Sequence, residues 1–271
     1  MTAHELTLGT VWRNVAAVRE RVPLVHSITN FVVMNTTANA LLAAGASPIM
    51  AHATEEMAEL VAIASALVIN IGTLSRPWID SMLLAGQAAR DRGVPVVLDP
   101  VGAGASTLRT TTALQLLEKA RPAVVRGNGS EIMALAGAEG DTRGVDSTHD
   151  AHAAADAART LARRHRCTVV VSGAVDLVTN GDDMVLVRGG NELMGRVTGM
   201  GCTATVLVGA HVAVASTPFE GAWTGMAAMA AAGSVAAAKA QGPGSFQMHF
   251  LDALYGLGIE DLRAHAEVVR S

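Results

Sequence analysis

The chain has 271 residues, of which 50% are hydrophobic, 16% are charged and 3% are aromatic. A chain that cannot bury enough apolar surface to fold shows the opposite balance, so this composition excludes intrinsic disorder. The net charge of -4 excludes a general positive field for nucleic acid. The length favours one α/β domain, which we expect to cover residues 1–271.

Cysteine content and apolar segments bear on the location of the protein. The two cysteines, Cys167 and Cys202, lack the pair spacing of a zinc site and are too few for a disulfide framework, which predicts a reduced, cytoplasmic protein. The N-terminal segment lacks the apolar core of a signal peptide, and residues 222–238 are too rich in Ala and Gly to span a bilayer, so we expect no membrane contact. The abundance of small residues, with 27 glycines, indicates close packing and apolar surface covered by other subunits.

Short β-branched runs alternate with helical patterns along the first half of the chain. Strands are expected at residues 22–27, 47–51, 66–72, 94–99 and 123–127. Helices are expected near residues 35–44, 55–64 and 77–92. Because these strands are apolar almost throughout, we expect them to be buried on both faces in a central parallel sheet.

The pattern changes in the second half. The basic stretch at residues 163–166 is expected to end a helix, because cations in the last turn favour the helix dipole. A strand at 168–173 follows, and residues 175–190 alternate around an Asn-Gly pair, which predicts a hairpin and antiparallel strands toward one sheet edge. From Thr203 onward the sequence predicts helices only. The expected fold class is α/β, a mostly parallel sheet with helices on both faces.

Ligands of open α/β sheets bind beyond the carboxyl ends of the strands, so the segments that follow strands are candidate sites. In the segment VTGMGCT, Gly199 and Gly201 allow successive N–H groups to point at one spot before a helix N-terminus. This pattern predicts an anion hole, in which Cys202 is expected to have a lowered thiol pKa. The segment alone is equally compatible with a helix-capping turn and an inert buried cysteine.

Charged residues follow two further strands. Asp99 ends a buried strand, where a carboxylate suits Mg²⁺ or a substrate hydroxyl. The glycines after it do not form a dinucleotide fingerprint, because Thr107 stands where the third glycine is needed. Arg126 closes the next strand and suits bidentate phosphate binding. Glu131 could hold Mg²⁺ through water, although Asn128 and Glu131 also match a capping box, which needs no function.

Three polar or sulfur-containing side chains complete the candidate set. Ser172 follows a buried strand and could contact a phosphate, although a turn into the hairpin explains it as well. Asn30 follows the first strand and Met50 ends the second. They are compatible with a flat, sulfur-containing or aromatic small molecule, although a methionine in such a place is more often part of a core. The chain has no G-x-x-x-x-G-K-[ST] motif, which excludes a P-loop ATP site.

Four motifs occur together in the order D-P-V-G-A-G, R-G-N-x-x-E, V-T-G-x-G-C and G-P-G-S-F-Q. With ITNFVVMNTTANALLAAGASPIMAH and ALVINIGTLS, they make the chain resemble the hydroxyethylthiazole kinase family of the ribokinase-like superfamily from about residue 22 to residue 247. The resemblance implies transfer of the γ-phosphoryl group of ATP, with Mg²⁺, to the hydroxyl of 4-methyl-5-(2-hydroxyethyl)thiazole in thiamin salvage. It also implies a homotrimer with the thiazole pocket at the interface between subunits.

The resemblance assigns binding roles to individual residues. Arg126 and Ser172 match ATP-binding positions, and Ser172 keeps the hydroxyl of the threonine that is commoner there. Met50 and Gly199 match thiazole-binding positions, and Asn30 lies in the segment that lines that pocket.

The resemblance also implies the metal and catalytic positions. Asp99 and Glu131 match acidic positions associated with Mg²⁺. Cys202 matches the active-site position at which most ribokinase-like enzymes have an aspartate. Because a thiolate binds the hard Mg²⁺ poorly, we expect Cys202 to orient the substrate hydroxyl or to act as a modest base. Two departures from the family pattern, Ala174 and Met200, leave the shape of the pocket open.

Other functions remain compatible with the fold class. The chain could be a ribokinase-like kinase for another vitamin-precursor alcohol, of pyrimidine or pyridoxal type, or a relative that uses ATP to repair a hydrated nicotinamide cofactor. It could also be a non-catalytic sensor of thiazole or nucleotide. The match at Asn30 and Met50 favours the thiazole, and the full set of charged and glycine positions disfavours a sensor, because a pure binder does not need all of them.

Overall fold

The fold of the chain was derived from a computed structural model, which describes residues 3–137 and 147–270. The strands are β1 (Leu24–Ile28), β2 (Ser47–Ile49), β3 (Ala66–Asn70), β4 (Val96–Asp99), β5 (Val124–Asn128), β6 (Thr168–Ser172), β7 (Val175–Thr179), β8 (Met184–Arg188) and β9 (Glu267–Arg270). The α-helices are α1 (Ala3–Arg21), α2 (Met34–Ala44), α3 (Met57–Ile63), α4 (Arg76–Arg92), α5 (Thr107–Ala120), α6 (Gly129–Gly137), α7 (Ser147–His165), α8 (Met200–Val212), α9 (Pro218–Ala237), α10 (Pro243–Gly256) and α11 (Ile259–His265). Two 3₁₀ helices are η1 (Thr54–Glu56) and η2 (Glu192–Arg196).

Within residues 3–137 and 147–270, the strands form one nine-stranded sheet in the order β2-β1-β3-β4-β5-β6-β7-β8-β9. The strands from β2 to β6 are parallel, and β7, β8 and β9 add antiparallel pairs toward one edge. This confirms the predicted mostly parallel sheet with an antiparallel edge. The carboxyl ends of the parallel strands therefore meet along one side of the sheet.

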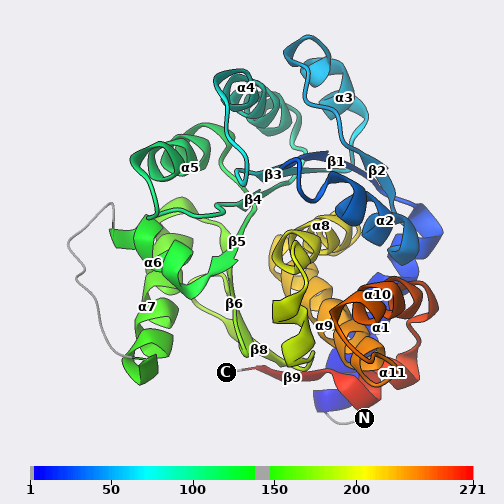
Figure 1. Ribbon diagram of the computed structural model, residues 1–271. Coiled ribbons are helices and arrows are strands. Elements are labelled where there is room, and N and C mark those ends of the chain that lie inside the picture. Colours follow the sequence, from blue (N-terminus) through cyan, green and yellow to red (C-terminus); the bar gives the residue numbers. More distant parts are fainter. Residues whose placement is uncertain (1–2, 138–146, 271) are drawn as a thin grey trace.

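Helices cover both faces of the sheet, as predicted. Figure 1 shows the sheet curving around α8 and α9, with α3 to α7 on the opposite, outer face. Successive residues of a strand point to opposite faces. Val124 accordingly belongs to the core with α8 and α9, and Val125 belongs to the core with α4, α5 and α7. Burial of both faces explains why these strands have almost no polar positions.

The predicted hairpin is present, and its loop is four residues long. β7 pairs with β8 up to Thr179 and Met184. The side chain of Asn180 accepts hydrogen bonds from the backbone N–H groups of Asp182 at 3.0 Å and Asp183 at 2.8 Å. The next residue, Gly181, has φ of 101°, in the left-handed region that glycine adopts without a steric penalty. The Asn-Gly pair thus reverses the chain, because the Asn180 side chain binds the loop backbone and Gly181 supplies the left-handed conformation.

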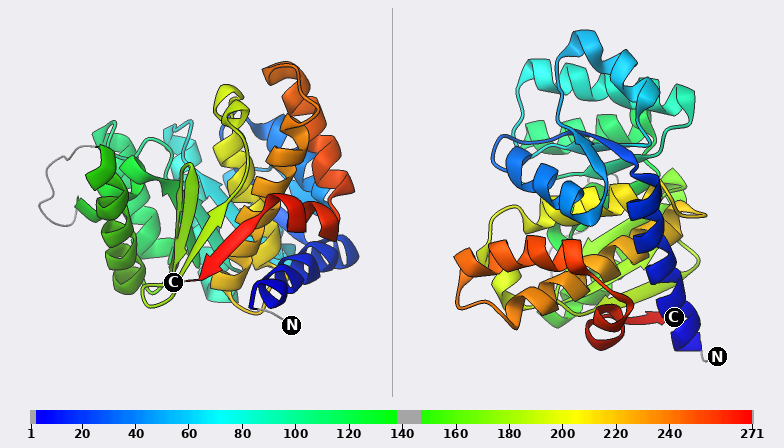
Figure 2. Two further views of the ribbon diagram at one scale, coloured as in Figure 1. Left: turned by 90° about the horizontal axis from the view of Figure 1, so that it is seen from below. Right: turned by 90° about the vertical axis from the view of Figure 1, so that its right-hand side faces the viewer.

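The prediction of helices only from Thr203 onward is wrong at the C-terminal end of that segment. α8 begins at Met200 and contains Thr203, but the last element is a strand, β9, antiparallel to β8. β9 is short and Val268 is its one buried residue, so it carries no readable alternation. Figure 2 shows β9 beside α1, with both chain ends at the same end of the molecule.

Two further sequence predictions concern helices. The basic residues Arg163, Arg164 and His165 form the last turn of α7, which confirms that this stretch ends a helix. Across residues 3–137 and 147–270, none of the helices has both the length and the apolar character needed to cross a membrane.

Candidate active site

Most of the polar side chains of the candidate site lie at the carboxyl ends of four neighbouring strands, β3 to β6. Asn70 and Asp99, the last residues of β3 and β4, are register partners. Asn128 and Ser172, the last residues of β5 and β6, are also register partners. Because the strands are parallel, these side chains lie level along one edge of the sheet, where the N-terminus of α8 faces them.

The carboxylate of Asp99 is buried and held by two hydrogen bonds. Its Oδ2 atom accepts from Asn70 Nδ2 at 2.8 Å and from Thr205 Oγ1 at 2.7 Å. Its Oδ1 atom is buried and has no hydrogen-bond partner among the described residues. Burial raises the pKa of Asp99 to about 6, against the lowering effect of the Arg126 charge. One carboxylate oxygen is thus fixed by the protein, and the other is available to a ligand.

The thiol of Cys202 lies in the first turn of α8 and contacts two asparagines. Its Sγ atom accepts from Asn70 Nδ2 at 3.2 Å and from Asn30 Nδ2 at 3.6 Å. Burial raises the pKa of Cys202 to about 11, and the Asp99 charge adds to the shift. The expectation of a lowered pKa is therefore wrong, because desolvation and a neighbouring carboxylate outweigh the hydrogen bonds and the charge of Arg126. At neutral pH Cys202 is a thiol.

The glycines before and within the first turn of α8 bring other groups close. Gly199, the N-cap residue, has φ of 82°, and no side chain caps the helix start. A Cβ atom on Gly199 would lie 2.6 Å from Val33 Cγ1, and a Cβ on Gly201 would lie 2.8 Å from Arg126 Nη1. The geometry therefore brings the open N-terminus of α8 against a guanidinium group, a combination that suits an anion.

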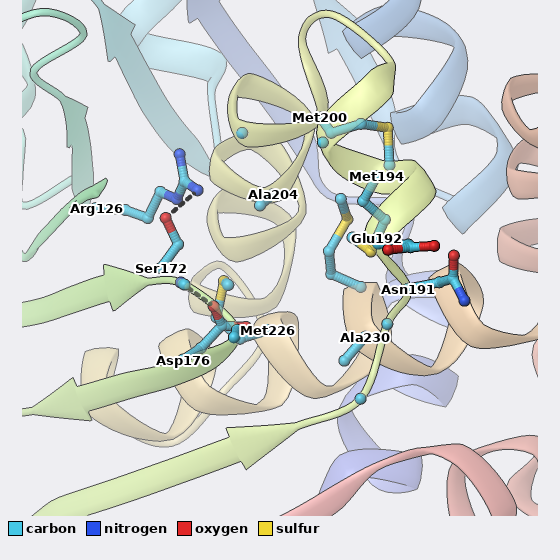
Figure 3. A pocket seen from close by; sticks show the side chains of 17 residues that line it. Arg126, Ser172, Asp176, Asn191, Glu192, Met194, Met200, Ala204, Met226 and Ala230 are labelled. Carbon is cyan, nitrogen blue, oxygen red and sulfur yellow. Dashed lines mark hydrogen bonds between the residues drawn. The ribbon is translucent and has the colours of Figure 1, made fainter. Parts of the chain in front are cut away.

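Arg126 and Ser172 lie together on the other side of that helix start. Arg126 Nη2 donates to Ser172 Oγ at 2.5 Å, and Ser172 Oγ donates to the Gly127 carbonyl at 3.3 Å. Both side chains face a cavity of about 570 Å³ (Figure 3). Its wall also includes the four methionines Met194, Met200, Met226 and Met229.

Asp176 is a further carboxylate in the wall of this cavity. Its Oδ1 atom accepts from the Gly173 N–H at 3.0 Å. Burial raises the pKa of Asp176 to about 6, whereas the Gly173 hydrogen bond and the Arg126 charge lower it. Asp176 was not predicted as a site residue, because it lies inside the alternating pattern of the hairpin, where a polar residue is expected.

Glu131 has both oxygens engaged by the backbone. Oε1 accepts from the Gly102 N–H and Oε2 accepts from the Asn128 N–H, each at 2.8 Å. The Glu131 N–H donates to Asn128 Oδ1 at 2.9 Å, which completes the predicted capping box. Glu131 thus ties the loop after β4 to the start of α6.

The described residues fit Mg²⁺ held largely by waters and substrate oxygens. No group of three or more His, Cys, Asp and Glu side chains within residues 3–137 and 147–270 could hold a metal ion by itself. Mg²⁺, however, commonly uses one or two carboxylates together with waters and phosphate oxygens. The unpartnered Oδ1 atom of Asp99 would be one such ligand, whereas both oxygens of Glu131 already accept backbone hydrogen bonds, so Glu131 would act only through water.

The structure brings the predicted residues into two groups. Asn30, Asp99 and Cys202 meet around the side chain of Asn70. The second group consists of Arg126, Ser172 and Gly201. Met50 follows β2 at the far edge of the sheet, and its half-buried side chain packs against the core around α8 and α9.

Asn70 and Arg109 are functional candidates that sequence analysis missed. Asn70 ends an apolar strand just as Asp99 does, so the same signal was present at both positions. Arg109 donates to the carbonyls of Ile71 and Val101 through Nη1, at 3.0 and 2.7 Å, and to that of Gly72 through Nη2, at 2.9 Å. Arg109 therefore holds the loops after β3 and β4 together, a role that no local motif reveals.

Comparison with known proteins identifies the family. The family model for the hydroxyethylthiazole kinase family matches residues 15–260. A hydroxyethylthiazole kinase of Nitratidesulfovibrio vulgaris is 76% identical over 260 residues, which are 96% of this chain and 97% of that protein. Another, from Syntrophus aciditrophicus, is 52% identical over 266 residues, 98% of each chain.

Solved structures agree with this result. The hydroxyethylthiazole kinase from Pyrococcus horikoshii OT3 superposes with a TM-score of 0.91 at 44% identity, over 97% of this chain and 99% of that one. A pyridoxal kinase from Staphylococcus aureus shares the fold at a TM-score of 0.57 and 15% identity, over 78% and 87% of the two chains. The chain has a ribokinase-like fold and belongs to the hydroxyethylthiazole kinase family.

Proposed function

We propose that this chain transfers the γ-phosphoryl group of ATP to the hydroxyl of 4-methyl-5-(2-hydroxyethyl)thiazole in thiamin salvage. Membership of the hydroxyethylthiazole kinase family supports the reaction and its substrate. The observation that supports the proposal most strongly is that the acceptor-side and donor-side residues both lie at the N-terminus of α8. Cys202 contacts Asn30 and Asn70 there, and Gly201 lies beside Arg126.

The reaction moves one phosphoryl group between two oxygen atoms. The hydroxyl oxygen forms a bond to the γ-phosphorus, the bond from that phosphorus to the β–γ bridging oxygen breaks, and ADP leaves with the electron pair. The hydroxyl proton is released. Catalysis of this transfer is mainly positioning and stabilisation of charge. Arg126 and the N–H groups at the start of α8 supply positive charge where the phosphates would lie.

The acceptor would bind on the side of Asn30. Asn30, Met50 and Gly199 form the proposed thiazole contacts, and Cys202 would meet the hydroxyl. Because burial raises the pKa of Cys202 to about 11, its thiol keeps its proton at neutral pH. We therefore assign Cys202 the role of orienting the hydroxyl rather than that of a base.

The donor would bind in the cavity beside Arg126 (Figure 3). Arg126 and Ser172 would hold phosphate oxygens, since a guanidinium and a hydroxyl are both suited donors. The nucleoside would extend into the cavity of about 570 Å³. Its methionine side chains are polarizable and make favourable contacts with flat aromatic rings.

Asp99 would hold Mg²⁺ through Oδ1, and Glu131 would act through water. When bound, Mg²⁺ neutralises charge on the phosphate groups. Asn70 and Thr205 fix the Asp99 carboxylate through Oδ2, which leaves Oδ1 without a hydrogen-bond partner among the described residues.

We also infer that the chain forms a homotrimer with the acceptor pocket at the interface between subunits. Phe31 and Val32 directly follow Asn30 and are 64% and 66% exposed. Adjacent exposed apolar side chains beside a site favour coverage by another subunit. Sedimentation of the protein at micromolar concentration is expected to show a trimer, and a monomer alone would contradict this inference.

ADP release with Mg-ATP tests the reaction. Hydroxyethylthiazole, hydroxymethylpyrimidine, pyridoxal and no acceptor are compared, and the product is identified by mass. We expect ADP release that depends on hydroxyethylthiazole, with a phosphorylated thiazole as product. ADP release with another alcohol alone would overturn the substrate, and binding of ATP and thiazole without turnover would overturn the activity.

A further inference from the structure

Asn70 lies at the centre of the acceptor side and has every hydrogen-bonding position of its amide engaged. Nδ2 donates to Asp99 Oδ2 at 2.8 Å and to Cys202 Sγ at 3.2 Å. Oδ1 accepts from Asn30 Nδ2 at 2.9 Å and from the Gly72 N–H at 2.9 Å. An amide side chain has two donor hydrogens and two acceptor lone pairs, so this set saturates it.

The partners also fix which way the amide points. Asp99 and Cys202 present acceptors to Nδ2, whereas Asn30 and the Gly72 backbone present donors to Oδ1. Rotation of the amide by half a turn would place Nδ2 against the two donor groups and Oδ1 against the Asp99 carboxylate oxygen. Asn70 is 1% exposed, so an unmatched group there would carry the full cost of burial without a partner.

The backbone around Asn70 is held close to it. A Cβ atom on Gly72 would lie 2.6 Å from Asn30 Nδ2 and 2.9 Å from Asn70 Oδ1. Only a residue without a side chain allows the loop to approach this far. Arg109 holds the same loop from the other side through the Gly72 carbonyl. The close approach of the loop after β3 therefore holds the side chains of Asn30 and Asn70 in contact.

We propose that Asn70 is the positioning residue that aligns the acceptor-binding side chain of Asn30 and the Cys202 thiol with the Asp99 carboxylate. This inference rests on the proposed function. The two halves of the amide have separate tasks: the Nδ2 half orients Cys202 and Asp99 for turnover, and the Oδ1 half holds Asn30 for acceptor binding.

Two substitutions separate these halves. Asn70→Asp keeps acceptor oxygens for Asn30 and the Gly72 N–H but replaces the amide that donates to Asp99 and Cys202. We expect its kcat to fall about tenfold or more, with the KM for hydroxyethylthiazole within about twofold of the wild type. Asn70→Leu removes both halves, so we expect a fall in kcat of about 100-fold and a clear rise in that KM. Both are measured at saturating Mg²⁺.

Asn14→Leu is the matched control. Asn14 is also a buried asparagine, and its Nδ2 atom donates to Glu220 and Thr224 at 3.1 Å, in a contact between α1 and α9. The substitution removes hydrogen bonds of the same kind away from the site. We expect it to lower the unfolding temperature and to leave kcat and both KM values unchanged. The KM for ATP is expected to stay unchanged in the Asn70 variants as well, because Asn70 does not line the donor cavity.

The outcomes distinguish a positioning role from a structural one. If both Asn70 variants keep the wild-type kcat, or if they raise the KM for ATP as much as that for the thiazole, the positioning role is overturned. Should Asn70→Leu fail to fold, Asn70→Asp decides the question through its split between kcat and KM. Wild-type protein without thiazole-dependent ADP release would instead overturn the proposed function, so the two failures remain separate.

Discussion

On the acceptor side of the site, the side chains of Asn30, Asn70 and Cys202 hold one another through hydrogen bonds, whereas on the donor side Arg126 and Ser172 face an open cavity of about 570 Å³. In the first region the side chains are engaged with one another, and the second region is open and lined by flexible methionines. A closed network loses alignment when one member changes, whereas an open cavity loses mainly one contact. Substitutions on the acceptor side should therefore act on kcat and on the KM for the thiazole, and those on the donor side on the KM for ATP.

The largest effect is expected for Asp99→Asn. This change removes the charge of the buried carboxylate that Asn70 and Thr205 orient. We expect kcat to fall about 100- to 1000-fold, measured as thiazole-dependent ADP release. Asp176→Asn is the matched control, because burial also raises the pKa of Asp176 to about 6 but it lies in the donor cavity. A fall in kcat as large for Asp176→Asn would contradict the different roles of the acceptor and donor sides.

Arg126→Met tests the donor side. It removes the charge beside Gly201 and the hydrogen bond to Ser172. A hydrogen bond to a charged group contributes about 1.5–3 kcal/mol, so kcat/KM for ATP should fall about 10- to 100-fold, with little change in the KM for the thiazole. Arg109→Met, which removes a guanidinium bonded to loop carbonyls, should lower stability and leave the KM for ATP unchanged. If Arg126→Met raised the KM for the thiazole as much as the KM for ATP, acceptor and donor would not bind to separate sides of the site.

Cys202→Ala is expected to slow the reaction without abolishing it. Loss of a general base costs about 100-fold or more, whereas loss of an orienting thiol should lower kcat about tenfold. The pH-independent rates of the variant and the wild type are compared at saturating substrates. A variant with no detectable kcat would contradict the orienting role, and good activity of Cys202→Asp would show that the position tolerates the acidic residue found in most ribokinase-like enzymes.

Ser172→Ala should have the smallest effect. It removes one hydroxyl that contacts Arg126 at the wall of the donor cavity. Water can replace the hydroxyl at this half-buried position, so we expect a net loss no larger than that of a typical intramolecular hydrogen bond, about 0.5–1.5 kcal/mol, and a rise in the KM for ATP of about 2- to 10-fold. Ser172→Thr keeps the hydroxyl and should stay near the wild type in steady-state kinetics. A large fall in kcat for Ser172→Ala with an unchanged KM for ATP would contradict the assignment of this hydroxyl to the donor side.

Much of the fold could be predicted because it depends on local pattern. Apolar runs mark the strands that are buried on both faces, and the Asn-Gly pair marks the hairpin between β7 and β8. β9 could not be predicted, because a four-residue edge strand with one buried side chain has no period. It forms only when the chain returns to β8 after one 3₁₀ helix and four α-helices.

The site divides in the same way. Asp99 could be predicted because parallel strands end along one edge, and the same rule could have selected Asn70. Arg126 is predicted to close its strand, but it lies two residues before the end of β5. The raised pKa of Cys202 could not be predicted, because it depends on burial and on the charge of Asp99, which comes from β4. The cavity wall could not be predicted either, because Met194, Met200 and Met226 come from three different elements whose packing no local pattern encodes.

We infer that acceptor and donor bind to separately built sides of one site. The decisive experiment is equilibrium titration of Asn30→Leu and Arg126→Met with hydroxyethylthiazole and with a non-hydrolysable ATP analogue. We expect Asn30→Leu to weaken thiazole binding and to leave nucleotide binding unchanged, and Arg126→Met to do the reverse. Loss of both affinities in either folded variant would show that the two sides are not separate.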